Sequence, residues 1–403
     1  MQLLLEGWRG IGQSLAIVNQ FQALAFLRRG DVNLYHRDLP TPMDWDAARN
    51  GSGLPPDDAA AISAIPTYDG APVDAVYRIV APSRSGASDD RRRTITFMVT
   101  ELGLGPGSLA PEVDRAFFSR DANLIVTPTA WSATRLVEAG FDSERVRIVP
   151  HGVDRRLFSP LSTEEQAGVR TRLGFAPDET VLLNIGGPFW NKGADLLLEA
   201  FALLRARGRR VRLVLKDQSS LYGLGMPNMI AQIGVRRPNL LADATLSAIS
   251  LIPGSLDFAQ LRELYGVADA YVSPYRAEGF NLPVLEAIAC NVPVIVTSGG
   301  ATDDFCPEPL AMRLPASPGA MDPEHGFPPR RFLQPSVDDL VDAMDRVCQG
   351  PSARAAATWS DARESVLQTF SWDRAATLLL DDAGLSGVVD QPAPTAEPIV
   401  VPS

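Results

Sequence analysis

The chain has 403 residues, of which 45% are hydrophobic and 21% are charged. This composition is typical of a globular protein of about two to three domains, and it excludes a disordered chain, a collagen-like fibre and a small disulfide scaffold. The formal net charge of −11 disfavours nucleic-acid binding, which depends on basic surfaces that neutralise phosphates. Of the 37 basic residues only Lys192 and Lys216 are lysines, which singles both out.

Cysteine usage and the chain ends indicate a cytoplasmic protein. Cys290, Cys306 and Cys348 form no closely spaced pair, as expected of reduced thiols. The three histidines are scattered, so no metal site is expected. The N-terminus lacks the basic start and long apolar run of a secretory signal, and no stretch of about 18 apolar residues could cross a membrane. Peripheral membrane contact stays open.

The first part of the chain alternates short apolar runs with amphipathic segments. Strands are predicted at Gln2–Leu5, Val32–Tyr35, Thr94–Val99, Leu124–Thr127 and Val146–Val149, and helices at Ser14–Leu27, Pro111–Ser119 and Ser132–Ala139. Residues 40–75 are rich in Pro, Gly, Asp and Ala and are predicted to be a long loop. Such alternation favours a parallel sheet with helices on both faces.

A second alternating block follows a polar, partly helical connector at residues 155–178. Its predicted strands are Thr180–Ile185, Val211–Leu215, Ala270–Ser273 and Val292–Val296, and its predicted helices are Ala194–Ala206, Asp257–Val267, Leu282–Cys290, Val337–Cys348, Ala353–Thr369 and Trp372–Ala383. The chain after Pro315 is predicted to be loop-rich before these last three helices. We expect an α/β fold of two facing Rossmann-like domains, with a ligand cleft at the carboxyl ends of the strands.

The segment Ser273–Ala287 carries the strongest chemical signal. A strand ends near Ser273, a loop carries Glu278, and a helix begins near Leu282 with Pro283 in its first turn. The loop N–H groups of Gly279–Leu282 then lie at the positive end of the helix dipole and make an anion site. Two carboxylates flanking an anion site suit a nucleotide sugar, which has hydroxyls at both ends and phosphates between. The alternative for Glu286 alone is a structural acid near a helix N-terminus.

This segment resembles the signature of the retaining GT-B glycosyltransferases of the large family four. In that signature two glutamates, separated by seven residues, stand inside Glu-Gly-Phe-Gly-Leu-Pro-x-x-Glu-Ala. The chain departs from it at Asn281, where Gly is commoner, and the larger side chain is expected to alter which sugar fits. Similarity covers about residues 120–385 and extends to Val146–Asp154 with Phe158, Asn184–Gly187, Asn191–Gly193, Asn291–Val296, Gly299, Gly300 and Phe370–Trp372.

The resemblance implies a metal-independent, retaining transferase that uses a nucleotide-diphospho-sugar as co-substrate and needs no other cofactor. Lys192 and Glu278 are the implied catalytic residues, with Glu286 on the ribose and Glu278 on the sugar. The implied sugar-donor site comprises Gly186, Gly187, Lys192, Lys216, Glu278, Gly279, Phe280, Asn281, Leu282 and Glu286. The family's arginine, five residues before its lysine, is Gly187 here, so Lys216 or a nearby arginine is expected to compensate.

The same resemblance sets the expected domain boundaries. An acceptor-binding domain is expected at residues 1–155 and a nucleotide-sugar-binding domain at 156–370. A helix at 371–389 is expected to cross back onto the first domain. Residues 390–403 are Pro-rich without a hydrophobic period, and they are predicted to be a disordered tail. The acceptor is a glycan, a lipid or a small molecule.

A glycine-rich loop follows the first strand. The resemblance implies that Gly10, Ile11 and Gly12 approach the donor phosphate and the acceptor, and that Glu101 faces the cleft where the family often has His. Taken alone, the loop is half of a dinucleotide fingerprint and lacks its third glycine, so an NAD-dependent oxidoreductase is the weaker alternative. A non-catalytic nucleotide-sugar-binding protein is the other alternative, because the usual arginine is missing.

Three further features are interpreted as structural or solvated rather than functional. Asp44-Trp45-Asp46 lies in the predicted loop and is interpreted as a solvated pair, since metal-dependent transferases need such carboxylates at a strand end. His151 is interpreted as structural. Trp131, Phe189 and Trp190 could stack on a base, but aromatic side chains at strand ends are more often part of the core.

Overall fold

The computed structural model describes residues 1–41, 51–84, 93–111, 113, 115–223, 225–238, 240–324, 326–350 and 357–385. The predicted solvated pair Asp44 and Asp46 and the predicted tail at 390–403 lie outside these residues. Within them, no helix is both long and apolar enough to cross a membrane.

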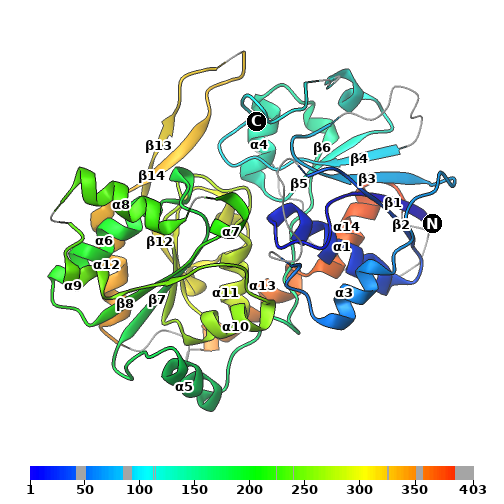
Figure 1. Cartoon of the computed structure of the whole chain (residues 1–403). Helices are drawn as coiled ribbons and strands as arrows, with labels where there is room; N and C mark the ends of the chain where they lie inside the picture. The colour runs from blue at the N-terminus through cyan, green and yellow to red at the C-terminus, as the bar shows by residue number, and fades with distance from the viewer. Residues whose placement is uncertain are drawn as a thin grey trace.

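The first part of the chain builds a six-stranded parallel sheet with the strand order β2-β1-β3-β4-β5-β6 (Figure 1). The strands are β1 (Gln2–Gly7), β2 (Asn33–Asp38), β3 (Ala75–Ile79), β4 (Arg93–Phe97), β5 (Leu124–Thr127) and β6 (Val146–Ile148). Helices α1 (Ser14–Arg29), α3 (Pro56–Ser63) and α4 (Ala130–Glu138) accompany it. The strand order reverses direction beside β1, and ligands of open α/β sheets bind at such points.

The second part builds another six-stranded parallel sheet, ordered β12-β11-β10-β7-β8-β9. Its strands are β7 (Thr180–Ile185), β8 (Val211–Lys216), β9 (Ile249–Ile252), β10 (Ala270–Ser273), β11 (Val294–Thr297) and β12 (Ala311–Leu314). The associated helices are α5 (Thr163–Arg172), α6 (Ala194–Ala206), α7 (Ser219–Tyr222), α8 (Met226–Arg236), α9 (Asp243–Leu246), α10 (Phe258–Val267), α11 (Leu282–Ala289), α12 (Val337–Cys348) and α13 (Ala357–Thr369). The last described helix, α14 (Trp372–Asp382), packs on α1 of the first part instead. The order reverses between β7 and β10. The predicted fold class, α/β with two facing Rossmann-like sheets, is confirmed.

Two predicted loops were wrong. The stretch predicted as loop at 40–75 contains α3, which begins with Pro at its first position and Asp57 and Asp58 in its first turn, a normal helix start. It also ends in β3, a fully buried five-residue strand without the polar alternation that would reveal it. After Pro315, β13 (Ala316–Ala320) and β14 (Arg331–Pro335) form an antiparallel ribbon, although Pro and Gly within β13 disfavour a strand.

Other differences are smaller. The helix predicted at Pro111–Ser119 is a short 3-10 helix over Arg115–Ser119. Between β8 and α10, the prediction left out α8, whose Met226 is buried, and the edge strand β9.

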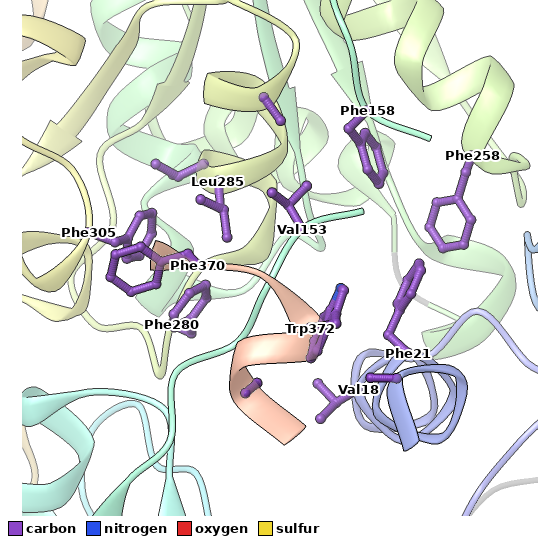
Figure 2. Close-up of a cluster of buried hydrophobic side chains, with 14 of the residues drawn as sticks. Val18, Phe21, Val153, Phe158, Phe258, Phe280, Leu285, Phe305, Phe370 and Trp372 are labelled. Atoms are coloured by element: carbon purple, nitrogen blue, oxygen red, sulfur yellow. The ribbon is translucent and has the colours of Figure 1, made fainter. Parts of the chain in front are cut away.

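An apolar cluster joins the two halves of the molecule, each of which is built around one of the six-stranded sheets (Figure 2). The ring of Phe21, on α1, stacks on Trp372 at 5.3 Å with an interplanar angle of 5°, and it lies 5.4 Å from Phe258 of α10. His151 sits among the rings of Phe97, Phe280 and Trp372, and burial lowers its pKa to about 3. His151 is therefore neutral at pH 7 and packs as a core residue.

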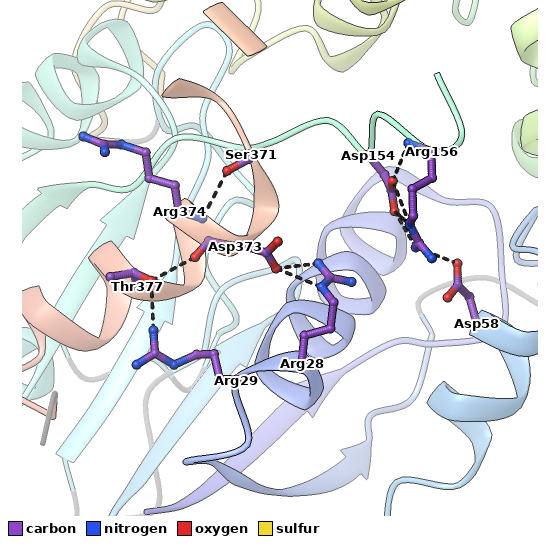
Figure 3. Close-up of polar contacts among 9 residues, drawn as sticks. All are labelled: Arg28, Arg29, Asp58, Asp154, Arg156, Ser371, Asp373, Arg374 and Thr377. Carbon is purple, nitrogen blue, oxygen red and sulfur yellow. Dashed lines mark hydrogen bonds and ion pairs between the residues drawn. The ribbon is translucent and has the colours of Figure 1, made fainter. Parts of the chain in front are cut away.

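Helix α14 lies against α1 rather than against the second sheet (Figures 1 and 3). Arg28 donates from Nε and Nη2 to Asp373 Oδ1 at 2.9 and 2.6 Å, and Arg29 donates to Thr377 Oγ1 at 2.8 Å. Near the connector, Arg156 bridges Asp154 and Asp58 of α3. These contacts attach the end of the described chain to its beginning. The domain boundaries at 155 and 370 stay a prediction.

We predict that Trp372→Ala lowers the free energy of unfolding by about 3–5 kcal/mol, because it removes a buried aromatic ring from the cluster. Asp373→Asn is the matched control: both partners of its ion pair with Arg28 are exposed, so the cost is expected at about 0–1 kcal/mol. Urea unfolding followed by circular dichroism measures both. Equal, small losses would mean that α14 does not depend on the apolar cluster.

Candidate active site

The candidate site lies where the strand order of the second sheet reverses. The chain leaves the carboxyl end of β7 through Gly186 to a 3-10 turn at Trp190–Lys192, and it leaves β10 through the loop that carries Glu278. Because β7 and β10 are paired and parallel, both exits are at the same edge of the sheet. The backbone N–H groups of Arg276 and Ala277 donate to Asn191 O at 2.7 and 3.2 Å, which ties the two exits together.

Lys192 is the centre of the polar contacts at this edge. Its Nζ lies 2.7 Å from Glu278 Oε2 and 2.7 Å from Glu101 Oε1, and Glu101 follows β4 of the first sheet. Asn191 Nδ2 donates to the second oxygen of Glu101 at 2.6 Å. The Glu278 side chain is only 8% exposed, against 42% for Glu101. The structure therefore brings Lys192, Glu278 and Glu101 together across the two halves.

Lys192, Glu101 and Glu278 influence one another's protonation. Burial by itself lowers the pKa of Lys192, but the charges and hydrogen bonds of Glu101 and Glu278 outweigh burial, so its pKa is raised. The ammonium is thus charged at pH 7. Burial raises the pKa of the Glu278 carboxyl; the Lys192 charge opposes burial, and the Glu101 charge adds to it.

Glu286 lies on α11, one turn past the start of the helix. Its Oε2 accepts a hydrogen bond from Tyr265 Oη at 2.6 Å. Burial raises the pKa of Glu286 to about 7, although the Tyr265 hydrogen bond lowers it. The carboxylate is therefore held in one orientation and titrates close to neutral pH. No local pattern in the sequence identified Tyr265, because it comes from α10.

The N-terminus of α11 has the geometry of an anion site. Within the described ranges, the N–H groups of Phe280, Asn281 and Leu282 have no hydrogen-bond partner. Gly279 packs tightly on the first half: a Cβ there would clash with Val99, and Thr129 Oγ1 donates to Gly279 O at 2.8 Å. The ring of Phe280 is buried and stacks on Phe305, so only its backbone is offered to a ligand.

The backbone conformation at Asn281 fits an asparagine where the family signature has glycine. Its φ of 80° and ψ of 63° lie in the left-handed region, which glycine adopts freely and asparagine tolerates better than most residues. The side chain is buried and donates to Ser273 Oγ at 2.9 Å. The Asn281 side chain is therefore used inside the loop, and its expected effect on which sugar fits stays a prediction.

The neighbouring glycines and Lys216 form the rest of this edge. A Cβ on Gly187 would clash with the Phe189 ring, so an arginine at this position would require Phe189 to move. Lys216 ends β8, and its Nζ donates to Asp217 O at 2.6 Å. Burial lowers the pKa of Lys216 to about 8, against the charge of Asp217. Arg276 is held in a bidentate pair with Asp195, at 2.8 Å for both bonds, and is committed there.

The glycine-rich loop of the first half is held by side chains of its own. The Gly10 N–H donates to Gln20 Oε1 at 2.9 Å. The first N–H groups of α1, from Leu15 and Ala16, donate to Gln13 Oε1. Ile11 is buried, and its backbone O accepts a long hydrogen bond from Gln20 Nε2 at 3.4 Å. Gly12 directly precedes Gln13, the N-cap residue of α1. The N–H groups of Gly10, Leu15 and Ala16 are therefore used within the protein.

The aromatic candidates differ in their surroundings. Trp131 Nε1 donates to Glu101 O at 2.6 Å and so fixes the backbone of that residue. The side chains of Phe189 and Trp190 are 36% and 41% exposed. Phe189 packs edge-on against Tyr222, and Trp190 lies under the Arg276 guanidinium.

In the described part of the chain, no group of three or more His, Cys, Asp or Glu side chains is placed to hold a metal ion.

Comparison with known proteins gives the family of this region. Residues 166–306, which include Lys192, Glu278 and Glu286, match the family "Glycosyl transferases group 1". The chain is 30% identical over 279 residues to a D-inositol 3-phosphate glycosyltransferase of Actinosynnema mirum, and the match covers 69% of this chain and 58% of that relative. The chain therefore carries a glycosyl transferases group 1 domain.

Solved structures show the fold of the whole chain. A glycosyltransferase from Rickettsia africae superposes with a TM-score of 0.67 at 14% identity, covering 95% of this chain and 97% of the other. HepE of Anabaena, solved in complex with UDP and glucose, gives a TM-score of 0.64 at 14% identity, with coverage of 95% and 99%. At this identity the likeness shows the fold alone, and that fold is GT-B.

We predict that Asn281→Ala lowers the free energy of unfolding by about 2–3 kcal/mol, since alanine must take up the left-handed conformation and loses the bond to Ser273. Asn281→Gly loses the same bond but relieves the backbone, so it should stay within about 1 kcal/mol of the wild type. Urea unfolding of both variants measures the difference. If alanine and glycine are equally tolerated, the backbone conformation does not explain the residue.

Proposed function

We propose that this chain is a glycosyltransferase that moves a sugar from a nucleotide-diphospho-sugar to an acceptor hydroxyl, with retention of configuration. One observation carries the proposal: Lys192, Glu278, Glu286 and the N-terminus of α11 converge at the carboxyl edge of the second sheet. Lys192 contacts Glu278, and the free N–H groups at the start of α11 stand in the chain between Glu278 and Glu286.

The proposed division of labour follows the geometry. The diphosphate binds Lys192 and the backbone N–H groups of Phe280 to Leu282. Glu286, oriented by Tyr265, accepts hydrogen bonds from the ribose hydroxyls. Glu278 accepts from the sugar hydroxyls beside the scissile bond, and the acceptor enters from the first half, where Glu101 and the Gly10–Gly12 loop lie.

The proposed chemistry is electrostatic. When the bond between the sugar and the diphosphate breaks, negative charge grows on the departing phosphate oxygen. In the proposed donor complex, Lys192 and the N–H groups at α11 face that charge, and each such group typically contributes a few kcal/mol to lowering the barrier. We propose that this protein charge does the work that a metal ion does in other transferases.

The sugar, the base and the acceptor are open to direct test. The relative from Actinosynnema mirum is named for D-inositol 3-phosphate, and HepE was solved with UDP and glucose. Uridine diphosphate sugars and inositol phosphate are therefore the first pair to try. A glycan or a lipid acceptor is the next choice.

A non-catalytic nucleotide-sugar-binding protein is the second candidate, favoured by Gly187 at the position of the family's arginine. Without that guanidinium, Lys192 is the cation that contacts Glu278 in the described site. A site with less positive charge would stabilise the departing diphosphate less. Release of nucleoside diphosphate from a nucleotide sugar, measured with purified protein, separates the two candidates.

We predict that Lys192→Ala lowers turnover by at least about 100-fold while the fold is retained, because an uncompensated diphosphate leaves slowly. The matched control is Arg207→Ala, which removes an exposed cation paired with Asp342 at the end of α6. Nucleoside diphosphate release measures turnover, and circular dichroism checks the fold. Lys192→Ala with half of the wild-type activity would contradict the assigned role.

We predict that nucleoside diphosphate binding weakens by about tenfold between pH 8 and pH 6. The Glu286 carboxylate accepts the ribose hydroxyls only when ionised, and its pKa of about 7 means that it becomes protonated across this range. Calorimetry at both pH values measures the effect. Glu286→Gln should bind the nucleoside diphosphate weakly at both pH values, and any pH dependence left should come from the titration of the nucleotide itself. Glu278→Gln should keep the wild-type affinity for the nucleoside diphosphate. Equal losses in the two variants would refute the division between ribose and sugar.

A further inference from the structure

We propose that Glu101 is an internal competitor of the sugar donor: its carboxylate occupies the cation that the donor diphosphate needs, and so it sets donor affinity. The inference rests on the proposed function, because it takes Lys192 to be the diphosphate cation. It goes further by assigning a role to a carboxylate of the opposite half of the molecule.

Glu101 is bound in the manner of a ligand anion. One carboxylate oxygen accepts from Lys192 Nζ at 2.7 Å, and the other accepts from Asn191 Nδ2 at 2.6 Å. A phosphate group offers the same two acceptors at a similar spacing, and charge-assisted bonds of this length are among the strong ones. The two hydrogen-bond donors are adjacent residues on a turn of the second half, whereas Glu101 belongs to the first half.

The charges at the site favour exchange. Lys192 faces two carboxylates, so with both ionised the three groups together carry one negative charge. A diphosphate brought to the same ammonium would add negative charge at contact distance, where repulsion is strongest. One carboxylate must therefore leave, or lose its charge, when the diphosphate arrives.

Glu101 is the carboxylate that can leave. The Glu278 side chain is 8% exposed and sits on the same half as Lys192, whereas the Glu101 side chain is 42% exposed and can return to water. The backbone of the Glu101 segment is anchored by Trp131 Nε1 on Glu101 O and by the Arg331 N–H on Leu102 O, both at 2.6 Å. A rotation of the side chain is then enough, and Lys192 keeps Glu278 in both states.

A static tie between the halves is the competing explanation, and it makes the opposite prediction. If Glu101 only holds the halves together, removing its charge loosens the site and leaves nucleotide affinity unchanged or weaker. If Glu101 competes for Lys192, removing its charge frees the ammonium and strengthens binding. Glu101→Gln separates the two, because glutamine keeps the size and can still accept from Asn191.

The experiment measures dissociation constants by calorimetry for UDP, GDP and ADP, and it compares variants with the nucleotide that the wild type binds most tightly. Glu101→Gln should bind that nucleotide about two- to fivefold more tightly. Asp304→Asn is the matched control: Asp304 Oδ2 accepts from the Ala130 N–H across the two halves at 2.7 Å, so the variant loses the same charge at the interface without touching Lys192. Its affinity should equal that of the wild type.

Three results would overturn the inference. Unchanged or weaker binding by Glu101→Gln, with normal binding by the wild type, refutes it alone and leaves the proposed function standing. Equal tightening in Asp304→Asn refutes it as well, because a looser interface would then be the cause. A wild type that binds none of the three nucleotides overturns the proposed function and this inference together.

Discussion

The ammonium of Lys192 is the point on which the arrangement of the site depends. Two carboxylates from different halves of the molecule face it and keep its pKa raised, at the edges where the strands of both sheets end. The surrounding contacts serve this geometry: Asn191 fixes the second oxygen of Glu101, and the backbone bonds to Asn191 O keep the exits of β7 and β10 together. A site of this kind is formed by closure of the two halves rather than by either sheet alone.

Sequence reasoning succeeded where the signal is local. The strands of both blocks are short apolar runs, and the spacing of Glu278 and Glu286 around a Pro-started helix needs only the residues between them. Lys192 was recognisable because lysine is so rare in this chain. The same reasoning located the parallel sheets but missed β3, which is buried on both faces and carries no periodic pattern, and the β13–β14 ribbon, whose Pro and Gly argue against a strand.

What the sequence could not supply are contacts between distant segments. Glu101 was recognised as a cleft residue, but its bonds to Asn191 and Lys192 join positions about 90 residues apart, and no local rule pairs them. The Tyr265 hydroxyl reaches Glu286 from another helix. Asn281 adds a feature that the sequence did not reveal: its backbone is in the left-handed region, so the position constrains conformation, while the expected effect on the sugar stays a prediction.

The contact between α1 and α14 has a consequence for biosynthesis. Arg28 and Asp373 are 345 positions apart, so the helix that covers Phe21 leaves the ribosome only after almost all of the described chain. Phe258 of α10 contacts the same ring but is also made after the first half, so this face of α1 stays at most partly covered until α14 arrives. Folding of the first half therefore cannot be finished during its own synthesis, and the nascent chain is most prone to aggregation in the interval before α14 arrives.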